Sequence, residues 1–207
     1  MAEKKMRIGV LISGGGTNLQ SIIDACEDGR LDARVVVVMS NHEGAYGLKR
    51  AEKAGIPALH VDRAAFETFA QYNSFIRDTL LEREVDVVAM AGYMRLLGKQ
   101  VLDAFPNRVL NIHPALLPSF PGASGIQDAF DFGVKVTGVT VHLANEKFDD
   151  GSILAQECVS IAEDDTLESL EAKVHEVEHR LFPMVLQWMA EDRIIVEGKK
   201  ARILPLP

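Results

Sequence analysis

The sequence predicts an α/β fold of the Rossmann-like type: a mostly parallel twisted sheet with helices on both faces and antiparallel strands in the C-terminal part. Short β-branched runs alternate with amphipathic stretches, which is the pattern of βαβ units. A glycine cluster follows the first of these runs, where such folds make their first strand-to-helix turn. Beyond residue 122 the apolar runs become longer and alternate with polar residues, as in antiparallel strands.

In the first half of the chain, apolar runs are expected to form strands and the amphipathic stretches between them to form helices. The strands are expected at residues 7–12, 35–39, 59–61, 85–89 and 108–113. The helices are expected at residues 18–26, 45–54 and 66–83. Gly55 and Pro57 end the second helix. The nearly continuous apolar run of the fourth strand is typical of a strand that is covered on both faces.

The second half of the chain predicts antiparallel strands and one long helix. The strands are expected at residues 134–143, 153–161, 193–196 and 201–204. The first two are joined by a polar turn, and the last two flank a Glu-Gly-Lys-Lys turn that indicates a terminal hairpin. Residues 166–189 have the period of a long helix, in which Pro183 is expected to cause a kink or a break.

The composition is that of a globular protein. Of the 207 residues, 47% are hydrophobic and 25% are charged, which are average values. We expect one domain over residues 1–207, with a seam near residues 114–124. No apolar run reaches the roughly 18 residues that a membrane span requires, and the amino terminus lacks the apolar stretch of an export signal. We therefore expect a cytoplasmic protein that does not contact membranes.

Charge and cysteine content argue against a nucleic-acid-binding protein and against a protein held together by disulfides or a metal. The chain has 30 acidic and 22 basic residues, and its formal charge of −8 disfavours binding to nucleic acid. Cys26 and Cys158 are far apart, with no Cys-x-x-Cys spacing, so we expect neither a disulfide framework nor a metal site. An anionic small substrate would need a local site built from backbone amides.

The segment from Asn111 to Pro118, followed later by Asp149, is the most informative part of the sequence. Asn111 and His113 are two residues apart at the end of an expected strand, so their side chains point to the same face. An amide can stabilise an oxyanion, an imidazole can transfer protons, and a carboxylate can orient the imidazole or favour its charged form. This set predicts acyl transfer. Taken alone, however, the pair fits better with a turn cap at Asn111 and a half-buried structural histidine at 113.

The segment from Gly14 to Gly16 lies between the first expected strand and the first expected helix, and Thr17 and Asn18 follow it. Without Cβ atoms its amides can approach a phosphate, and the start of a helix offers unpaired N–H groups. The spacing matches neither the dinucleotide fingerprint nor the P-loop, so one phosphate is expected. The alternative is a tight turn in which Thr17 or Asn18 is the N-cap of the helix.

Residues 91–97 follow the fourth expected strand and would border the same crevice. Met94, Leu96 and Leu97 could hold a flat heterocycle there. Taken alone, the segment fits better as the start of a helix that packs into the core.

Two further patterns involve histidines. His175 and Glu178 face the same way on the long helix, where they contact a polar substrate or simply lie on a solvated face. The solvated face is the simpler interpretation unless the crevice is nearby. His142 could stand beside the strand that carries Asn111 and support it.

Together these motifs closely resemble the folate-dependent phosphoribosylglycinamide formyltransferases, also called GAR transformylases. The resemblance runs essentially end to end, and it rests on residues 11–20, 91–95, 111–118, 120–122, 137–142, 148–156 and 175–181. The Asn-x-His-Pro segment with a distant Asp is shared by formyltransferases in general. The glycine loop with Thr-Asn and the His-Glu-x-Glu-His segment point more narrowly to this family.

The resemblance implies transfer of the formyl group of 10-formyltetrahydrofolate, a co-substrate, to the amine of glycinamide ribonucleotide, with no metal. The expected mechanism is direct attack of the neutral amine, with a water molecule carrying the proton from nitrogen to nitrogen. The partners would be these two small molecules, and the chain a monomer or a homodimer. The half at about 1–113 would bind the phosphate, and the half at about 114–207 would carry the folate and catalytic loops.

The resemblance also assigns residues to each role. The catalytic residues would be Asn111, His113 and Asp149. The phosphate would lie on Gly16, Thr17 and Asn18, and the glycinamide and ribose near His175 and Glu178. The folate would contact Met94, Arg95, Leu96, Leu97, Asn111, Asn145, Glu146, Lys147, Phe148 and Asp149.

The chain departs from the family pattern at three positions. Ser124 stands where the family usually has a histidine, Phe69 or a neighbour stands where many members have an arginine, and Asp150 replaces the usual glycine after the catalytic Asp. The first two affect substrate contacts, and the sequence offers no physical reason for the third.

Three alternatives remain at this point. The chain could be another formyltransferase that uses 10-formyltetrahydrofolate, such as one acting on methionyl-tRNA, although its negative charge fits tRNA poorly. It could be a formyltetrahydrofolate hydrolase. It could also be a nucleotide-binding module without chemistry, because a fold alone does not establish activity.

Overall fold

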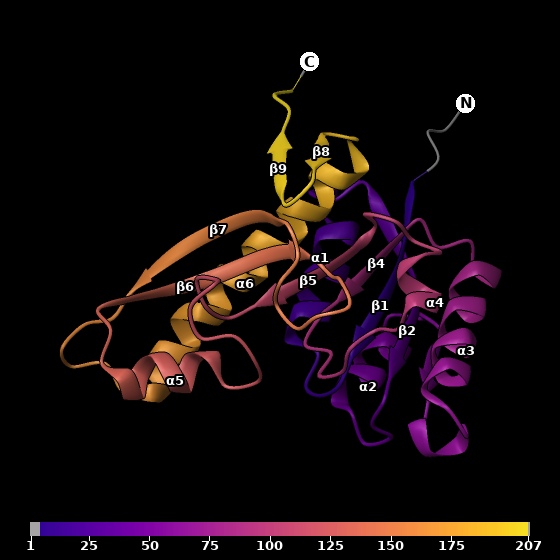
Figure 1. Ribbon diagram of the computed structural model, residues 1–207, viewed down its shortest axis with the longest axis horizontal. Coiled ribbons are helices and arrows are strands. Elements are labelled where there is room, and N and C mark those ends of the chain that lie inside the picture. Colours follow the sequence, from indigo (N-terminus) through magenta and orange to yellow (C-terminus); the bar gives the residue numbers. More distant parts are fainter. Residues whose placement is uncertain (1–4, 207) are drawn as a thin grey trace.

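The computed structural model describes residues 5–206, so residues 1–4, on which the expectation about an export signal partly depends, lie outside the described residues. Helices and strands alternate along the first two thirds of the chain (Figure 1). The elements are β1 (Met6–Ile12), α1 (Thr17–Glu27), β2 (Ala33–Ser40), α2 (Tyr46–Lys53), β3 (Ala58–His60), η1 (Arg63–Ala65), α3 (Phe69–Glu82), β4 (Val87–Met90), α4 (Lys99–Leu102), β5 (Val109–His113), α5 (Gly125–Phe132), β6 (Val136–Leu143), β7 (Ile153–Ser160), α6 (Leu167–Ala190), β8 (Ile194–Glu197) and β9 (Lys200–Ile203).

The strands form one nine-stranded sheet in the order β3-β2-β1-β4-β5-β6-β7-β9-β8. The first five pair in parallel, and β5–β6, β6–β7 and β8–β9 pair antiparallel, so the expected fold class is confirmed. The strand order changes direction between β1 and β4, and open α/β sheets bind ligands in the crevice beyond the carboxyl ends of strands at such a point.

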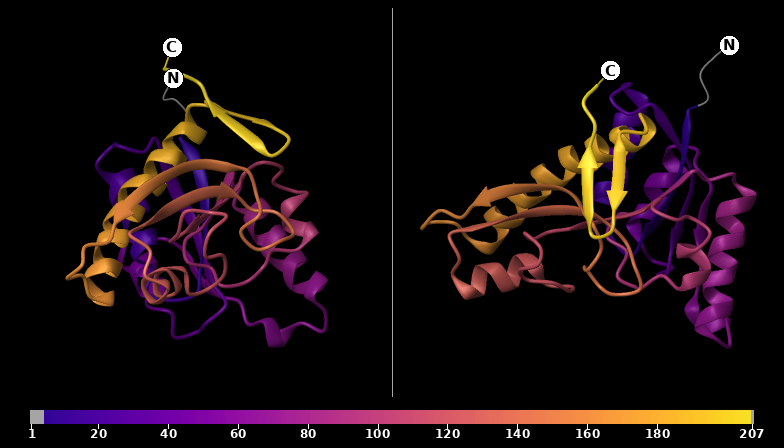
Figure 2. Two further views of the ribbon diagram at one scale, coloured as in Figure 1. Left: turned by 60° about the vertical axis from the view of Figure 1, so that its left-hand side comes forward. Right: turned by 45° about the horizontal axis from the view of Figure 1, so that its top comes forward.

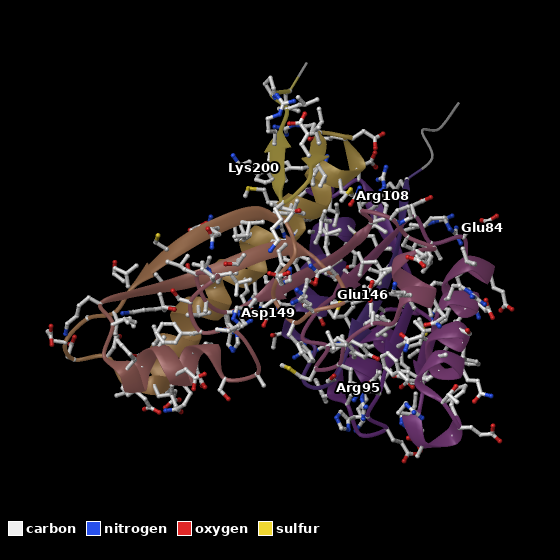
Figure 3. All side chains as sticks on the ribbon, in the orientation of Figure 1. Glu84, Arg95, Arg108, Glu146, Asp149 and Lys200 are labelled. Atoms are coloured by element: carbon white, nitrogen blue, oxygen red, sulfur yellow. The ribbon has the colours of Figure 1, made fainter. Side chains whose placement is uncertain are left out.

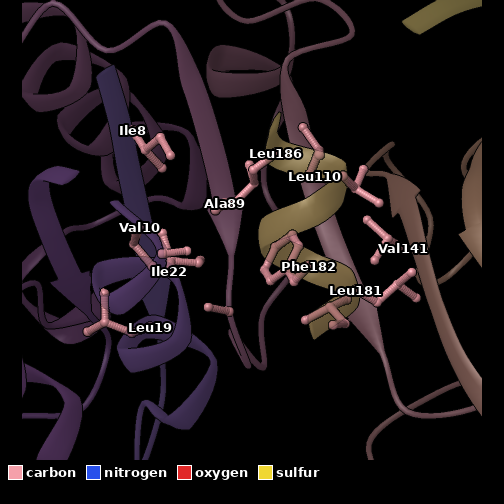
Figure 4. Packing of buried hydrophobic residues seen from close by; sticks show 14 of the residues in the cluster. Ile8, Val10, Leu19, Ile22, Ala89, Leu110, Val141, Leu181, Phe182 and Leu186 are labelled. Carbon is pink, nitrogen blue, oxygen red and sulfur yellow. The ribbon is translucent and has the colours of Figure 1, made fainter. Parts of the chain in front are cut away.

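The helices cover both faces of the sheet. One core cluster packs β1 and β4 against α1, α2, α5 and α6, and the other packs them against α3 and α4. Neighbouring residues of β1 alternate between the clusters: Val10 belongs to the first and Leu11 to the second. Figure 4 shows Ile22 of α1 and Phe182 of α6 within the first cluster. This double coverage explains the apolar runs in the sequence.

The antiparallel part extends the sheet away from the parallel strands. In both views of Figure 2, β6 and β7 run out as a long ribbon, with α6 along it and α5 near its far end. The hairpin of β8 and β9 joins the sheet through a parallel bridge between Ile153 and Lys200. No helix within residues 5–206 is long and apolar enough to cross a membrane.

Several details differ from the sequence expectations. Two helices, α4 and α5, were not expected: α4 has only four residues, and α5 begins among glycines that indicate a loop. Pro183 does not break the long helix, which runs without interruption over Leu167–Ala190. The third helix begins at Phe69 because Thr68 and Gln71 form a capping box there, three residues later than expected.

The packing of α6 leads to a prediction about stability. Phe182 is fully buried in the first core cluster. We expect Phe182→Ala to lower the free energy of unfolding by about 3 to 5 kcal/mol, because it removes apolar contacts and leaves a cavity. Urea denaturation followed by circular dichroism measures this change. Phe132→Ala is the matched control, because Phe132 is 78% exposed, and a comparable loss there would contradict the assignment of α6 to the core.

Candidate active site

The loops after β1 and β4 meet at the crevice predicted by the strand order. The Ser13 amide donates to the carbonyl of Gly92 at 3.0 Å, and the Met94 amide donates to Oγ of Ser13 at 2.8 Å. Oγ of Ser13 in turn donates to Asn41 at 2.6 Å. One serine therefore holds the glycine loop and the segment around Met94 in fixed positions beside each other.

A cavity of about 300 Å³ opens next to this junction, at the carboxyl ends of β4 and β5. Its lining is Met90, Gly92, Tyr93, Met94, Arg95, Leu96, Leu97, Asn111, Ile112, His113, Pro114, Gly122, Ala123, His142, Ala144, Asn145, Lys147, Phe148 and Asp149. All residues expected to contact the folate line it, with the exception of Glu146. In Figure 3, Asp149 lies near the middle of the molecule, and Arg95 lies below it.

Glu146 lies just outside, where an adjoining hollow shares Leu96 and Leu97 with the main cavity. Phe69 lines this hollow, and Nζ of Lys99 is 3.3 Å from a carboxylate oxygen of Glu146. Phe69, which with its neighbours is expected to stand where many family members have an arginine, thus places an aromatic ring at this hollow, with a lysine nearby.

The three residues expected to be catalytic converge in the main cavity. Asn111 and His113 project from β5 on the same face, as their spacing requires. Asp149 comes from the loop between β6 and β7, and its Oδ2 is 3.6 Å from Nδ1 of His113. Its Oδ1 is 3.4 Å from Nδ2 of Asn111. Residues that are 38 positions apart in sequence thus lie side by side.

The ring of His113 is almost fully enclosed, and both of its nitrogens face oxygen atoms. Nε2 donates to the carbonyl of Phe120 at 2.7 Å, because a carbonyl can only accept. Nδ1 faces Asp149 at 3.6 Å, which is longer than a hydrogen bond. Nε2 is therefore the firmly bonded nitrogen of the ring, and Nδ1 is left with only a weak contact to the carboxylate.

The carboxylate of Asp149 is 7% exposed and ionised at neutral pH. Burial opposes ionisation, but the pKa of Asp149 still lies below its usual 3.8, because the neighbouring His142, the amide of Gly122 and the nearby His113 outweigh burial. A carboxylate that is ionised at this depth must be surrounded by hydrogen-bond donors.

His142 stands beside Asn111, as the sequence suggested, because β5 and β6 pair these two residues directly. Nδ1 of His142 donates to the carbonyl of Leu143 at 2.9 Å, so Nε2 of the neutral ring accepts from Nδ2 of Asn111 at 3.1 Å. The amide of Asn111 is therefore oriented by His142. Its second N–H makes only a weak contact with Oδ1 of Asp149, at an N···O distance of 3.4 Å.

One contact of the site was missed by sequence reasoning. The amide of Gly122 donates to Oδ2 of Asp149 at 2.8 Å. Gly122 has φ of 100°, a conformation that glycine adopts freely. The Pro-Gly pair at 121–122 signalled a turn there, but not the distant loop to which the turn would bond. Ser124, two residues later, lies at the N-cap position of α5 and makes no side-chain capping bond.

The glycine loop ends at Gly16, which is itself the N-cap of α1, so the suggested capping by Thr17 or Asn18 is wrong. Gly16 has φ of 70°, and a Cβ there would lie 2.6 Å from the Cα of Gly47. The loop thus needs glycine at this position. Asn18 is buried, and its Oδ1 has no partner within residues 5–206.

The start of α1 and the middle of α6 share a small surface hollow, separate from the main cavity. Thr17 lines it together with Arg50 and His179. Arg50 donates through Nε to the carbonyl of Gly15 at 2.8 Å. The expected phosphate-binding residue Thr17 therefore lies beside a guanidinium group and an imidazole.

His175 and Glu178 form a hydrogen-bonded pair, with Nδ1 of His175 2.7 Å from Glu178. The solvated-face interpretation is wrong for Glu178, whose side chain is only 5% exposed. The ring of His175 stacks on that of His179, with centroids 6.1 Å apart. Neither His175 nor Glu178 lines the main cavity. They lie one turn along α6 from the hollow that contains Thr17.

The cysteines and the possible metal ligands are dispersed in the described part of the chain. Among residues 5–206, no cluster of three or more His, Cys, Asp or Glu side chains could hold a metal ion. Cys26 and Cys158 are both free thiols. Burial raises the pKa of Cys26 to about 11, which keeps this thiol protonated and unreactive at neutral pH.

Comparison with known proteins identifies relatives that span nearly the whole chain. The family model described as formyl transferase matches residues 6–186. Phosphoribosylglycinamide formyltransferase of Haemophilus influenzae is 42% identical over 195 residues, which are 94% of this chain and 92% of that protein.

Solved structures agree with this relationship. Glycinamide ribonucleotide transformylase 1 from Symbiobacterium toebii has a TM-score of 0.94 at 47% identity, with 97% of this chain and 95% of that chain covered. A formyltetrahydrofolate deformylase from Pseudomonas syringae pv. tomato has a TM-score of 0.88 at 28% identity, with 98% of this chain and 67% of that chain covered.

The pair of His175 and Glu178 leads to a prediction about pH. The hydrogen bond with Glu178 raises the pKa of His175 above its usual 6.5, although burial opposes this. Because the folded protein then holds the proton more tightly than the unfolded chain, the pair stabilises the fold below pH 6.5. This contribution is lost as pH rises through the raised pKa.

We therefore expect His175→Gln to lower the free energy of unfolding more at about pH 6 than at about pH 9. Urea denaturation of both proteins at the two pH values measures the difference. His60→Gln, at an exposed histidine at the end of β3, is the control. Equal losses at both pH values would contradict a stabilising role of the charged pair.

Proposed function

The chain belongs to the formyl transferase family, and we propose that it transfers the formyl group of 10-formyltetrahydrofolate to the amine of 5'-phosphoribosylglycinamide in purine biosynthesis. The observation that carries this proposal is the convergence of Asn111, His113 and Asp149 in one cavity. An amide donor, an imidazole and an ionised carboxylate are what the transfer of an acyl group between two nitrogens requires.

The proposed reaction begins with attack of the lone pair of the neutral amine on the formyl carbon. The π electrons of the C=O bond move to oxygen, and a tetrahedral oxyanion forms. A water molecule then carries the proton from the attacking nitrogen to N10 of the folate. The bond between the formyl carbon and N10 breaks, the C=O bond re-forms, and no bond to the enzyme is made.

The oxyanion would be stabilised by two donors. The second N–H of Asn111 is weakly held at present, and the 3.4 Å contact with Asp149 can be exchanged for a stronger one with the oxyanion. Nδ1–H of His113 is likewise weakly held, at 3.6 Å from Asp149. Both groups are held at fixed positions on β5, so little rearrangement is needed when negative charge develops.

Asp149 would favour the doubly protonated ring of His113 and order the water that moves the proton. Its ionised state supports this role, because an ionised carboxylate accepts hydrogen bonds from water and from the ring. His142 would act by orienting the amide of Asn111, since it bonds one of the two N–H groups and leaves the other for the substrate.

The pterin ring of the folate would occupy the main cavity, whose lining combines apolar side chains with few polar groups. The residues proposed to contact the folate are Met94, Arg95, Leu96, Leu97, Asn111, Asn145, Lys147, Phe148 and Asp149, with Glu146 at the adjoining hollow. Met94 and Phe148 are exposed at the edge of the cavity and could cover a flat ring.

The ribonucleotide would bind from the glycine loop toward α6. Its phosphate would lie on Gly16, Thr17 and Asn18, where the free amides at the start of α1 favour an anion. His175 and Glu178 would receive the glycinamide and ribose. A buried, hydrogen-bonded carboxylate suits recognition of an amine or hydroxyl group.

Three further expectations remain proposals. The single domain over residues 1–207 is supported by the one sheet that runs through both halves. A cytoplasmic location is supported by the two free cysteines. Action as a monomer or a homodimer on two small molecules, without nucleic acid, is supported by the net charge of −8.

Hydrolysis of 10-formyltetrahydrofolate is the second candidate, because the deformylase from Pseudomonas syringae pv. tomato shares the fold. The two reactions differ only in whether an amine or water attacks the formyl carbon. The geometry around His175 and Glu178 favours transfer, since a hydrolase would not need a site for an amine substrate.

The two reactions give different results in one assay. The absorbance change on deformylation of a 10-formyl folate analogue is measured with and without glycinamide ribonucleotide. We expect the change only when both are present, because transfer needs the amine. A change with the folate alone would indicate the hydrolase, and no change in either case would indicate a binding module without chemistry.

In the same assay, we expect Asn111→Ala and His113→Ala each to lower kcat by about 10² to 10³, because each removes one donor to the oxyanion. The KM values should change much less, since these contacts strengthen only in the transition state. His60→Ala, at the exposed end of β3, is the control and should keep full activity. An active His113→Ala enzyme would refute the catalytic assignment.

A further inference from the structure

The loop that carries Asp149 needs support from outside itself. Asp149 has φ of 52°, in the left-handed region, which a non-glycine residue rarely adopts. Its carboxylate must nevertheless stay beside His113 and the amide of Gly122. Contacts on the other residues of the loop therefore decide whether this conformation persists.

On its inner side, the loop is held by β6. The amide of Leu143 donates to the carbonyl of Ser152 at 2.9 Å. Gly151 packs so closely that a Cβ there would overlap the carbonyl of Leu143. These contacts fix Gly151 and Ser152, but they do not reach Asp150.

On its outer side, the loop is held by the C-terminal hairpin. Nζ of Lys199 lies 2.8 Å from Oδ1 of Asp150. Oγ of Ser152 donates to the carbonyl of Gly198 at 3.2 Å, and Ile153 bridges to Lys200. Figure 3 labels both Lys200 on the hairpin and Asp149. The hairpin thus contacts Asp150, Ser152 and Ile153, which lie on either side of Gly151.

The hairpin and the catalytic loop also line a common hollow. Asp149 lines this hollow together with Asp150, Lys199 and Arg202, and it lines the main cavity as well. The loop therefore lies between the main cavity, where the substrate groups are expected, and the hairpin. A shift of the hairpin side moves Asp149 directly.

We propose that Lys199 is a positioning residue for formyl transfer: its ion pair with Asp150 holds the loop so that Asp149 keeps its left-handed backbone and its place beside His113. This inference rests on the proposed function. It also supplies a physical role for Asp150, the residue that replaces the usual glycine. The hydrogen bond and charge of Lys199 lower the pKa of Asp150, so this carboxylate is ionised at neutral pH.

The expected effect is modest and depends on salt. The side chains of Lys199 and Asp150 are 77% and 38% exposed. Ion pairs of this kind change an equilibrium by about two- to fivefold, and salt screens them. A hairpin that merely packed on the fold would give no such salt dependence, because apolar packing does not weaken as the ionic strength rises.

The test measures kcat and amide exchange for Lys199→Met at low ionic strength and in about 1 M salt, where screening acts within about 3 Å. We expect kcat to fall about two- to fivefold at low salt, with both KM values unchanged. Hydrogen exchange of residues 148–152 should become faster, while the rest of the sheet is unaffected. Wild type in high salt should approach the variant in both measurements.

Two variants serve as controls. Lys200→Met removes the adjacent lysine, which makes no ion pair within the described part of the chain, and it should behave as wild type. Lys199→Arg should restore most of the rate, because it keeps the charge. Combining Lys199→Met with Asp150→Asn should be no worse than either change alone, because both remove the same contact.

The outcomes separate this inference from the proposed function. If wild type transfers no formyl group, the proposed function and this inference both fall. If wild type is active and Lys199→Met has the same rate and the same exchange as wild type, only this inference falls. It also falls if Lys200→Met loses as much activity, or if the effects of Lys199→Met and Asp150→Asn add.

Discussion

A buried carboxylate must be paired, and this constraint organises the centre of the protein. Removing an ion such as Asp149 from water costs several kcal/mol unless hydrogen bonds and opposite charge replace the lost hydration. Here the replacements come from the amide of Gly122, from Asn111 and from two histidines. Loops that are far apart in sequence therefore have to meet at this one side chain.

The change from parallel to antiparallel pairing at β5 makes this meeting possible. A further parallel strand would have required a crossover helix, and its carboxyl end would have carried an unrelated loop. Because β6 runs antiparallel to β5, His142 lies directly beside Asn111. The chain leaves β6 at Leu143, which pairs with Leu110 near the start of β5. The loop that follows then returns Asp149 to Asn111 and His113.

The two proposed substrates would bind in two separate regions of the site. The main cavity, at the ends of β4 and β5, has an apolar lining suited to a flat heterocycle. The hollow at the start of α1 is lined by Arg30, Arg50 and His179 together with Asp24, so it has more basic than acidic groups. Ser13 bonds to the loops of both regions, so their separation is set by the fold and not by a flexible linker.

Residue type and local spacing were sufficient to predict the sheet strands and the main helices, because hydrophobic period and side-chain alternation are local properties. The same reasoning failed at α5, whose glycines resemble a loop, and at Glu178, whose burial depends on what packs against α6. The residues that line the cavity were assigned through the resemblance to a known family. The amide of Gly122 and the ammonium of Lys199 reach Asp149 and Asp150 only in the folded chain. Sequence alone thus determined which chemical groups are present and which strand face carries them, whereas the tertiary structure decided their distances, because contacts between distant loops depend on how the whole sheet packs.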